Sequence, residues 1–320
     1  NVIRCWDIGK DDLESLFNQI LEKNITTVVL QFNYGFFDFN YLSVFIRKIH
    51  ANKIKLIVFL HSSIDPLLDE TKKIKDLSRA LSLSNRILVH SPSDLNRLKN
   101  IDLVDNVTLF PHGILDADLF LDKDHYFKKK NNLFHFCTYG FCLPNKGFPE
   151  LIKAISLLHK EGFKCRLTLY TALYNDESSL RFYQQLVHLI NNLNLQKYIK
   201  IDTSFTTDEE TLLKLSRTDL VIFPYQLTNE SASGAVRQAI TSLTPVAVTP
   251  LSIFDDVLDV VYELPGCSPF LIAKGVRNWA EESFANPLTT KQKEWRKQHS
   301  FKKLGYRLQG IIRSIEINHK

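Results

Sequence analysis

Residues 223–250 read FPYQLTNESASGAVRQAITSLTPVAVTP, and this stretch decides the fold. It opens on the end of an apolar run at 221–223, passes through a polar loop at 229–233 and continues from Gly234 with apolar residues at helical spacing. The free amides at a helix start and the positive end of its dipole favour an anion, and Ser and Gly let the backbone approach that anion closely. The stretch therefore predicts a phosphate-binding loop, although a plain Ser-rich helix cap has the same pattern.

The residues that follow this loop resemble the nucleotide-sugar motif of glycosyltransferase family 4. Glu230 is followed after seven residues by Gln238, where the family carries its second Glu, and then by Pro245 and an apolar strand at 246–248. Upstream, residues 139–147 read YGFCLPNKG, which is similar to the family's glycine, basic residue and Lys-Gly loop. Two motifs at the expected mutual distance favour a single nucleotide-sugar site.

The resemblance implies which residues bind the donor. They are Gly140, Phe141, Lys146, Glu230, Ser231, Ala232, Ser233, Gly234, Arg237 and Gln238. Two of them depart from the family. Gln238 would hydrogen-bond ribose hydroxyls without the charge of a carboxylate, and Phe141 stands where many members carry Arg. Lys146 is then the one cation of its loop. Arg237 either compensates for the missing Arg or is a surface residue of the helix.

Apolar β-rich runs alternate with helical patterns along the chain, which is typical of βα units around parallel sheets. We expect strands at 2–6, 27–31, 55–60, 86–90, 106–110, 133–138, 166–170, 199–202, 220–223 and 246–248. Together with the resemblance, this pattern implies an α/β protein of GT-B architecture, with two Rossmann-like domains facing across a cleft. The N-terminal domain is expected to be incomplete and to lack its first βα unit.

Four parts of the chain are expected from the break in this pattern and from the charge of the last residues. They are an acceptor-side Rossmann-like domain at 1–115, a linker at 116–132, a nucleotide-sugar-binding Rossmann-like domain at 133–283 and a basic helical segment at 284–320 that packs back on the N-terminal domain. The last segment holds nine Lys or Arg against two Glu, a net charge of +7, so the rest of the chain carries −2.

Apolar residues within this basic segment recur at helical spacing, at Leu304, Leu308, Ile311 and Ile315. The segment therefore predicts an amphipathic helix with one cationic face. A solvated basic face is one explanation of the charge, and peripheral contact with an anionic membrane is the other. Nucleic acid is not an expected partner, because no binding motif accompanies the charge.

Three histidines each follow a predicted strand of the N-terminal domain: His61, His90 and His112. A lone histidine at a strand end is more often structural, so each role depends on the resemblance. His61, in the sequence FLHS, resembles the family's acceptor-side histidine, and His112 resembles a position near the hinge. Gln31, the last residue of the strand predicted at 27–31, is a further candidate for the acceptor side of the cleft.

The chemistry is likewise implied by the resemblance: a retaining transfer from a nucleotide-diphosphate sugar, with His61, Lys146 and Glu230 as catalytic residues. Lys146 and the loop amides would stabilise the charge of the leaving diphosphate, and Glu230 would hold sugar hydroxyls. Beyond the donor no cofactor is expected, and no Asp-x-Asp cluster lies in either motif to hold a metal. Residues 233–237, SGAVR, resemble mannosyltransferase-like members that build bacterial polysaccharide or lipopolysaccharide. The implied donor is GDP-mannose, and the implied acceptor is a glycan or glycolipid.

Length and composition agree with two ordinary domains, since 320 residues with 44% hydrophobic residues can bury two cores. Five scattered cysteines indicate reduced thiols and a cytoplasmic protein, at most peripheral at the inner face of the membrane. The absence of Met indicates an excised fragment or replaced methionines. Two other functions stay open: a nucleotide-sugar epimerase, which needs a pair of carboxylates, and a catalytically silent GT-B module of a larger protein.

Overall fold

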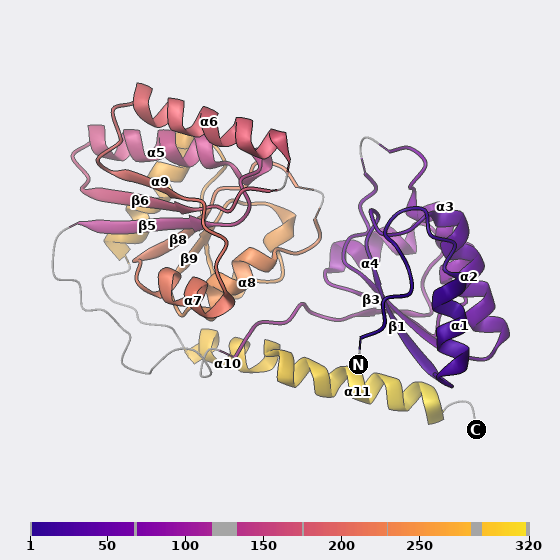
Figure 1. Ribbon diagram of the computed structural model, residues 1–320. Helices are drawn as coiled ribbons and strands as arrows, with labels where there is room; N and C mark the ends of the chain where they lie inside the picture. The colour runs from indigo at the N-terminus through magenta and orange to yellow at the C-terminus, as the bar shows by residue number, and fades with distance from the viewer. Residues whose placement is uncertain are drawn as a thin grey trace. The chain divides into compact units, whose positions relative to one another are not determined.

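The computed structural model divides into two compact units (Figure 1). It describes residues 2–66, 69–116, 133–174, 176–228, 230–282 and 290–317. Unit 1 takes in the chain up to His112, residues 230–232 and the chain from Leu304 on. Unit 2 takes in the chain from Gly113 to Thr228 and from Ser233 to Lys303. The expected linker at 116–132 lies outside the described residues, apart from its first residue.

Unit 1 is built on a parallel sheet with the strand order β1-β2-β3-β4. Its strands are β1 Thr27–Phe32, β2 Lys55–Leu60, β3 Arg86–Val89 and β4 Val107–Leu109. Its helices are α1 Glu14–Glu22, α2 Phe39–Ala51, α3 Ile74–Leu81, α4 Pro92–Lys99 and α11 Phe301–Ile317. All four strands run in the same direction, so their carboxyl ends lie at one edge of the sheet.

Successive residues of β2 face opposite sides of this sheet. Val58 lies in a buried cluster with residues of α1, α2 and α3, whereas Ile57 and Phe59 lie in a second cluster on the other face. That second face is covered by α11 through the residues predicted from their helical spacing, Leu304, Leu308, Ile311 and Ile315. The apolar side of the predicted amphipathic helix is therefore buried within unit 1.

Unit 2 is built on a parallel sheet with the strand order β10-β9-β8-β5-β6-β7. Its strands are β5 Phe134–Tyr139, β6 Cys165–Tyr170, β7 Ile199–Asp202, β8 Leu220–Phe223, β9 Val246–Val248 and β10 Tyr262–Glu263. Its helices are α5 Phe148–Lys160, α6 Glu177–Asn192, α7 Asp208–Ser216, α8 Gly234–Thr241, α9 Pro269–Glu282 and α10 Thr290–His299, with short 3-10 turns η2 Pro144–Lys146, η3 Ser252–Phe254 and η4 Leu258–Val260.

The two faces of this sheet carry separate cores, and Figure 1 shows α5, α6 and α9 on one face and α7 and α8 on the other. In β8, Ile222 packs toward α5 and α9, and its neighbour Phe223 packs toward α8. The strand order runs outward in two directions from the central pair β5 and β8. This is the Rossmann order, and it places the point where the order reverses between those two strands.

Nine of the predicted strands are confirmed, with ends that differ by at most one or two residues, but the strand expected at 2–6 is wrong. In the described sheet β1 pairs with β2 and stands at the edge, and residues 2–6 form no strand beside it. The Trp6 ring instead stacks on Phe37, with ring centres 5.1 Å apart. Aromatic packing therefore holds Trp6, whereas Val2 and Ile3 are exposed.

The basic segment expected to pack on the N-terminal domain does so only in its second half. The helix α10 belongs to unit 2, where Trp295 packs against the cluster that contains α8. Arg296 donates a hydrogen bond of 3.2 Å to the carbonyl of Thr241, at the end of α8. The apolar and polar contacts of α10 are thus made inside unit 2, and the packing on unit 1 begins with α11.

Candidate active site

The carboxyl ends of β5 and β8 lie side by side in unit 2, because these two strands are paired in the sheet. The loop at residues 140–147 begins where β5 ends, and the segment that leads into α8 begins where β8 ends. Adjacent strands at the reversal of a Rossmann sheet leave a crevice where ligands bind. The structure therefore brings the two sequence motifs together at the place where a nucleotide would bind such a fold.

Gly147 is required by the close approach of the two segments. Its φ angle is 71°, and a Cβ atom at this position would lie 1.7 Å from the carbonyl oxygen of Pro224. The amide of Gln226 donates a hydrogen bond of 3.1 Å to the carbonyl of Asn145, which joins the same two segments. No side chain fits between the two segments. The backbone geometry therefore requires the glycine of the Lys-Gly pair in the first motif.

Lys146 is buried, and its ammonium group lies 4.2 Å from the centre of the Tyr225 ring. This cation–π contact fixes the charge over the first residues that follow β8. The Tyr225 hydroxyl lies 3.3 Å from Oγ of Ser233, the residue that caps α8. Tyr225 therefore connects the cation of the first motif to the helix start of the second.

The start of α8 has the geometry of an anion site. Ser233 Oγ accepts a hydrogen bond of 3.3 Å from the amide of Val236, which leaves the earlier amides of the helix without an intrahelical partner. At Gly234, a Cβ atom would meet no described atom within 4 Å. A Cβ at Gly140 would approach Ala235 to 3.9 Å, so the first motif also borders this helix start. Open space, free amides and the helix dipole together suit a phosphate.

Arg237 is not a surface residue of α8. Its side chain is 3% exposed, forms an ion pair with Asp256 and donates a hydrogen bond of 3.0 Å to the carbonyl of Ser233. A guanidinium held on both sides in this way supports the first turn of the helix. The structure therefore places Arg237 behind the helix start, where it orients Ser233.

Gln238 lies on the same helix and donates a hydrogen bond of 2.6 Å to Asp208, at the start of α7. Its side-chain oxygen is buried and has no hydrogen-bond partner among the described residues. The amide nitrogen is thus occupied by Asp208 in unit 2, and the role of Gln238 in binding the ribose stays a prediction.

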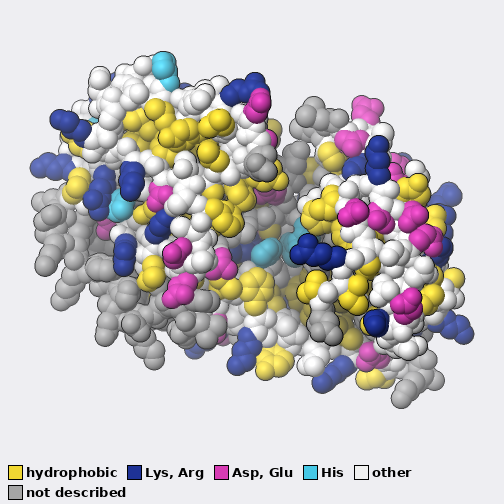
Figure 2. Space-filling view, in the orientation of Figure 1, with side chains coloured by type: hydrophobic (Ala, Val, Ile, Leu, Met, Phe, Trp, Pro, Cys, Tyr) yellow, Lys and Arg dark blue, Asp and Glu magenta, His cyan; other side chains and the backbone are white. Residues whose placement is uncertain are grey.

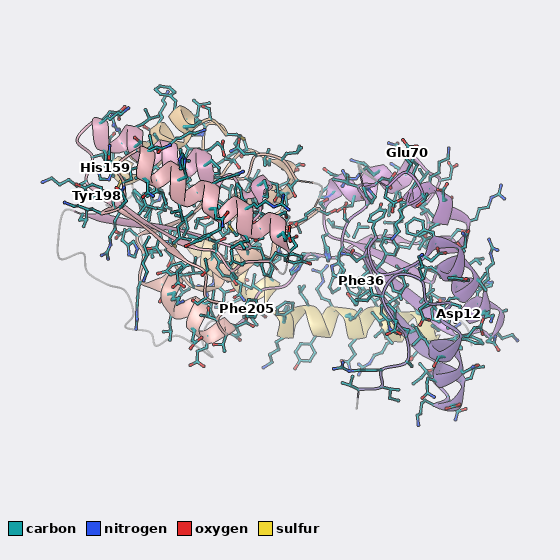
Figure 3. All side chains as sticks on the ribbon, turned by 45° about the horizontal axis from the view of Figure 1, so that its top comes forward. Asp12, Phe36, Glu70, His159, Tyr198 and Phe205 are labelled. Atoms are coloured by element: carbon teal, nitrogen blue, oxygen red, sulfur yellow. The ribbon has the colours of Figure 1, made fainter. Side chains whose placement is uncertain are left out.

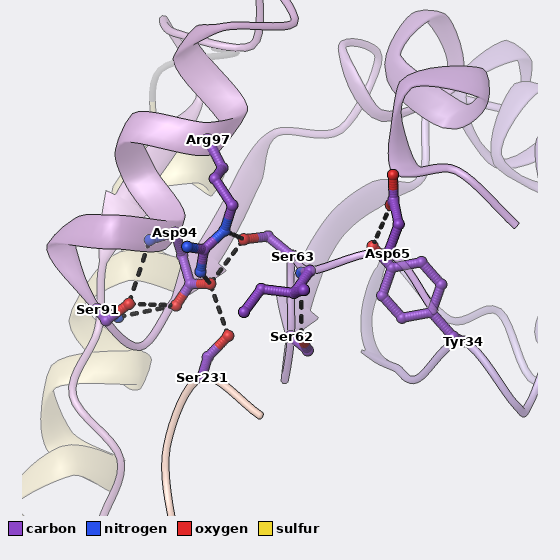
Figure 4. A network of polar contacts seen from close by, with 9 residues as sticks. Tyr34, Ser62, Ser63, Asp65, Ser91, Asp94, Arg97 and Ser231 are labelled. Carbon is purple, nitrogen blue, oxygen red and sulfur yellow. Dashed lines mark hydrogen bonds and ion pairs between the residues drawn. The ribbon is translucent and has the colours of Figure 1, made fainter. Parts of the chain in front are cut away.

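The middle of the second motif, residues 230–232, belongs to unit 1. Ser231 is buried there and donates a hydrogen bond of 2.6 Å to Asp94 on α4, as Figure 4 shows. Glu230 beside it is exposed, and Ala232 is half-buried. Ser231 is therefore held through its side chain, whereas the sequence predicted a loop that binds the donor through its amides.

Asp94 is fully buried and receives hydrogen bonds from three serines and one arginine (Figure 4). The partners are Ser63 at 2.6 Å, Ser91 at 2.6 Å, Ser231 at 2.6 Å and Arg97 at 2.6 Å. Burial by itself raises the pKa of this carboxyl, but these hydrogen bonds outweigh it and hold the pKa below its usual range. Asp94 was missed in the sequence, although Ser91-Pro-Ser-Asp94 has the pattern of a capping box.

The histidines expected at the acceptor side come together at the carboxyl edge of the unit 1 sheet. His61 follows β2, and its Nε2 lies 2.8 Å from Oε1 of Gln31 on β1. Its Nδ1 lies 3.3 Å from Nε2 of His90, which follows β3. The His112 ring lies 5.2 Å from the His90 ring. The four side chains therefore form one row across neighbouring strands.

Within this row His61 is exposed and His90 is buried. Neighbouring groups still cover part of the His61 imidazole, and this partial burial lowers its pKa, so the neutral form is favoured near neutral pH. A neutral imidazole at an exposed strand end can accept a proton or a hydrogen bond from a hydroxyl group. The acceptor-side role predicted for His61, Gln31 and His112 is compatible with this geometry.

An exposed group of aromatic rings lies at the carboxyl edge of unit 2 and was not predicted. The Phe141 ring lies 5.4 Å from Tyr174, after β6, and 6.4 Å from Phe205, after β7 and labelled in Figure 3. The exposed fractions are 40% for Phe141, 53% for Tyr174 and 83% for Phe205. In the sequence, only Phe141 pointed to this aromatic group, because it stands where many family members carry Arg. Nothing in the sequence around Tyr174 or Phe205 indicated that their rings lie beside it.

The described residues contain neither a candidate metal centre nor a helix that could span a membrane. No set of three His, Cys, Asp or Glu in this part of the chain is placed to hold a metal ion. Likewise, none of the helices in the described ranges combines the length and the apolar character needed to cross a membrane.

No protein-family model matches the chain, and no curated protein matches it. Solved structures do. A glycosyltransferase from Rickettsia africae has a TM-score of 0.75 at 14% identity and covers 95% of this chain and 80% of its own. Sucrose-phosphate synthase from Thermosynechococcus elongatus has a TM-score of 0.76 at 13% identity and covers 96% and 77%. HepE from Anabaena, in complex with UDP, has a TM-score of 0.74 at 14% identity and covers 93% and 82%.

At these identities the likeness shows the fold and not the activity. The fold is that of the GT-B glycosyltransferases, as the βα pattern and the family resemblance together predicted.

Proposed function

We propose that the protein is a glycosyltransferase that moves a sugar from a nucleotide-diphosphate sugar to a hydroxyl group of a glycan or glycolipid. One observation carries the proposal: the ammonium of Lys146 and the start of α8 are joined through Tyr225 at the switch point of the unit 2 sheet. A cation and a helix start at this point suit a diphosphate. The GT-B fold supports the same conclusion.

The transfer begins with loss of the nucleoside diphosphate, so charge on the leaving group has to be stabilised first. Lys146 and the amides at Gly234 and Ala235 supply this stabilisation in our proposal. The donor needs no metal ion, because the cation and the helix dipole take its place. We propose retention at the anomeric carbon, with the acceptor attacking from the face that the diphosphate leaves. A covalent nucleophile on the protein is then not required.

The sugar and the acceptor are assigned to residues of unit 1. Glu230 is exposed and holds hydroxyl groups of the donor sugar in the proposal. His61 presents an exposed imidazole to the acceptor hydroxyl, with Gln31 as its neighbour at 2.8 Å. His112 completes the acceptor side.

The exposed rings of Phe141, Tyr174 and Phe205 suit the base of the nucleotide. A base has two flat faces, and stacking on an aromatic ring is worth about 1 to 3 kcal/mol per base. Phe141 stands directly after Gly140, so the rings begin beside the phosphate loop. We propose that this aromatic group takes over part of the donor binding that an Arg at position 141 would supply.

GDP-mannose is our proposed donor, on the resemblance of residues 233–237 to mannosyltransferase-like members, and bacterial polysaccharide or lipopolysaccharide is the proposed product. HepE was solved in complex with UDP, so a uridine nucleotide donor is the alternative to compare with GDP-mannose. A thermal-shift screen decides between them, because a ligand that binds the folded protein raises its Tm. GDP-mannose should raise Tm more than UDP-glucose, and the reverse order would assign the uridine donor.

A silent sugar-binding GT-B module is the second candidate. The observation that favours it is the bond of Gln238 to Asp208, which occupies the side chain expected to hold the ribose. Incubation with a radiolabelled donor and a glycolipid acceptor separates the possibilities. Transfer of label supports the transferase, binding without turnover supports the silent module, and interconversion of the donor without an acceptor would show an epimerase.

A further inference from the structure

We infer that Arg237 and Asp256 are positioning residues for the start of α8. They hold the peptide between Ser233 and Gly234 so that the Gly234 amide points out of the helix toward a phosphate group. The orientation of this peptide follows from unit 2 alone, and the phosphate that it faces rests on the proposed function. The competing explanation is that the ion pair only stabilises the packing of the segment after β9 against α8.

Arg237 makes its two contacts through different nitrogens of the guanidinium. Its Nη1 donates a hydrogen bond of 3.0 Å to the carbonyl of Ser233, and its Nη2 forms the ion pair with Asp256. The exposed fractions of the Arg237 and Asp256 side chains are 3% and 14%. A guanidinium is planar and rigid, so a carboxylate that fixes one nitrogen also fixes the direction in which the other donates. Asp256 therefore sets how Arg237 meets Ser233.

Asp256 is itself held in place by the chain around it. It follows the 3-10 turn η3, whose Phe254 is fully buried and lies 5.3 Å from Tyr225, measured between ring centres. The residue after Asp256, Val257, is also fully buried, and its amide donates a hydrogen bond of 2.9 Å to the carbonyl of Phe254. The position of the carboxylate is thus fixed by packing on both sides and not by Arg237 alone.

The carbonyl of Ser233 determines where the Gly234 amide points. In a trans peptide the C=O and N–H bonds point in opposite directions. Arg237 lies one turn into the helix and bonds to this carbonyl, so the N–H of Gly234 is directed out of the helix. Gly234 is exposed, and a Cβ atom there would meet no described atom within 4 Å. An amide at this position has no acceptor within its helix, so a phosphate oxygen can accept from it.

A hold on Ser233 matters because α8 is short. It has eight residues, and a helix of this length is marginal without tertiary contacts. The side chain of Ser233 has a different partner from its carbonyl, since its Oγ lies 3.3 Å from the hydroxyl of Tyr225, whose ring lies 4.2 Å from the ammonium of Lys146. A shift of Ser233 would therefore change the separation between the Gly234 amide and Lys146, the two groups assigned to the diphosphate.

A double variant separates positioning from stability. Arg237→Met with Asp256→Leu removes both charges, and replacing a buried ion pair by apolar residues of similar size often leaves the stability unchanged. We expect a Tm close to that of the wild type, but a Kd for inorganic pyrophosphate, GDP and UDP that is about tenfold higher or more. Isothermal titration calorimetry measures the Kd. A double variant that binds as tightly as the wild type would overturn the inference.

The matched control carries the same substitutions at another Arg–carboxylate pair of unit 2, Arg277→Met with Glu161→Leu, between α9 and α5. Its Kd should equal that of the wild type. A tenfold loss in this control as well would overturn the inference, because any lost ion pair of unit 2 would then weaken binding.

Should the double variant fail to fold, two single variants decide. Arg237→Lys has one nitrogen for two contacts and should weaken binding. Asp256→Asn keeps an oxygen that accepts from Nη2 of Arg237, so its Kd should stay within about threefold of the wild type. A Kd in Arg237→Lys equal to that of the wild type would overturn the inference, because a charge alone would then suffice.

The orientation of the peptide has a direct readout that needs no turnover. The chain has 11 glycines, so nitrogen-15 labelling of glycine gives a simple amide spectrum, and Gly234→Ala identifies the Gly234 signal by its absence. Pyrophosphate should shift this signal in the wild type. In the ligand-free double variant the signal should move or broaden, because its peptide is no longer held. An unchanged Gly234 signal in the double variant would overturn the inference.

These measurements distinguish the inference from the proposed function. Binding of pyrophosphate that is weakened in the double variant, together with no transfer of label from any donor, would support the positioning role and overturn the transferase. Transfer of label by a double variant with the Kd and kcat of the wild type would do the reverse. A wild type that binds none of the three probes would overturn both.

Discussion

Ser231 donates a hydrogen bond of 2.6 Å to Asp94, a residue 137 positions earlier in the chain. Both residues are buried in unit 1, and the same carboxylate oxygen also accepts from Ser63 and Arg97. The bond attaches the central residue of the second motif to a carboxylate that no motif contains. The conformation of Glu230, the residue just before Ser231, therefore depends on Asp94 as well as on the sequence of its own loop.

Asp94→Asn should lower the free energy of unfolding by about 2 kcal/mol at neutral pH, because hydrogen bonds to a charged group contribute about 1.5 to 3 kcal/mol. The pKa of Asp94 is held below its usual range in the folded protein, after burial is outweighed by its hydrogen bonds. The stabilisation is therefore present above the unfolded pKa of about 4 and is lost as the pH falls toward the folded pKa. Urea unfolding at several pH values measures it.

The control for this variant is Asp105→Asn, at an exposed carboxylate, which should change the stability by less than about 0.5 kcal/mol. If Asp94→Asn lowered the free energy of unfolding by the same amount at neutral and at acid pH, the predicted dependence of stability on the ionisation of Asp94 would be wrong. Ser231→Ala should cost about 1 kcal/mol, since it removes one partner of the network.

Lys146→Ala should weaken binding of the nucleoside diphosphate by about 10- to 100-fold, because charge-assisted contacts contribute about 1.5 to 3 kcal/mol. Isothermal titration calorimetry measures the Kd. The matched control is Tyr225→Phe, which keeps the ring beneath the ammonium and removes the hydroxyl that reaches Ser233. An unchanged Kd in Lys146→Ala would show that the lysine has only a structural role.

Glu230→Ala should impair use of the whole sugar donor while the bare nucleoside diphosphate binds nearly as before. The reason is that Glu230 is assigned to the sugar hydroxyls and Lys146 to the phosphates. Paired titrations with donor and nucleoside diphosphate provide the check, and Glu230→Gln, which keeps the shape without the charge, should be intermediate. Equal weakening of both ligands would assign Glu230 to the nucleotide instead.

Gly147→Ala should destabilise unit 2 far more than Gly162→Ala. Both glycines have positive φ angles, 71° and 79°, so both variants carry a backbone cost of about 1 to 2 kcal/mol. At Gly147 the added Cβ also meets the carbonyl of Pro224 at 1.7 Å, whereas at Gly162 no described atom lies within 4 Å. Thermal unfolding of the two variants compares them, and equal Tm values would show that the two loops separate easily.

The exposed face of α11 is the part of the protein that we expect to contact an anionic membrane. Lys302, Lys303 and Arg307 are exposed there together with Phe301 and Tyr306, and Figure 2 shows basic and hydrophobic side chains along this helix. Such a face should bind anionic vesicles at low salt and release them as the Debye length falls to about 8 Å at physiological salt. Cosedimentation with anionic and neutral vesicles measures the binding.

The variant for this test changes three exposed side chains, Lys302, Lys303 and Arg313, to Glu and so reverses their charges, and the buried side of the helix stays intact. Its control reverses three exposed lysines of unit 2, Lys153, Lys160 and Lys164. Loss of binding in the first variant alone supports the membrane contact. Equal binding by both variants, or no binding by the original protein, would identify the basic face as solvated surface.

The sequence by itself determined the features that depend on neighbours in the chain. Apolar runs such as 55–60 and 220–223 became the strands β2 and β8, because burial on both faces of a parallel sheet leaves little room for polar residues. Gly140 directly follows β5 and Ser233 caps α8, and the backbone and capping preferences of these two residues act locally. These local patterns and their order predicted βα units around parallel sheets, and the resemblance to glycosyltransferase family 4 added the GT-B architecture.

Only the tertiary structure decided which side chains meet. The contacts of Arg237 with Asp256, Ser231 with Asp94, and His61 with His90 join segments whose separation in the chain leaves no periodic signal. The strand expected at 2–6 is wrong for the same reason, since a strand needs a neighbouring strand and none pairs with these residues in the described sheet. Strand order and helix packing bring such partners together. The charge, the tautomer and the burial of each side chain are then set by its partner and not by the local sequence.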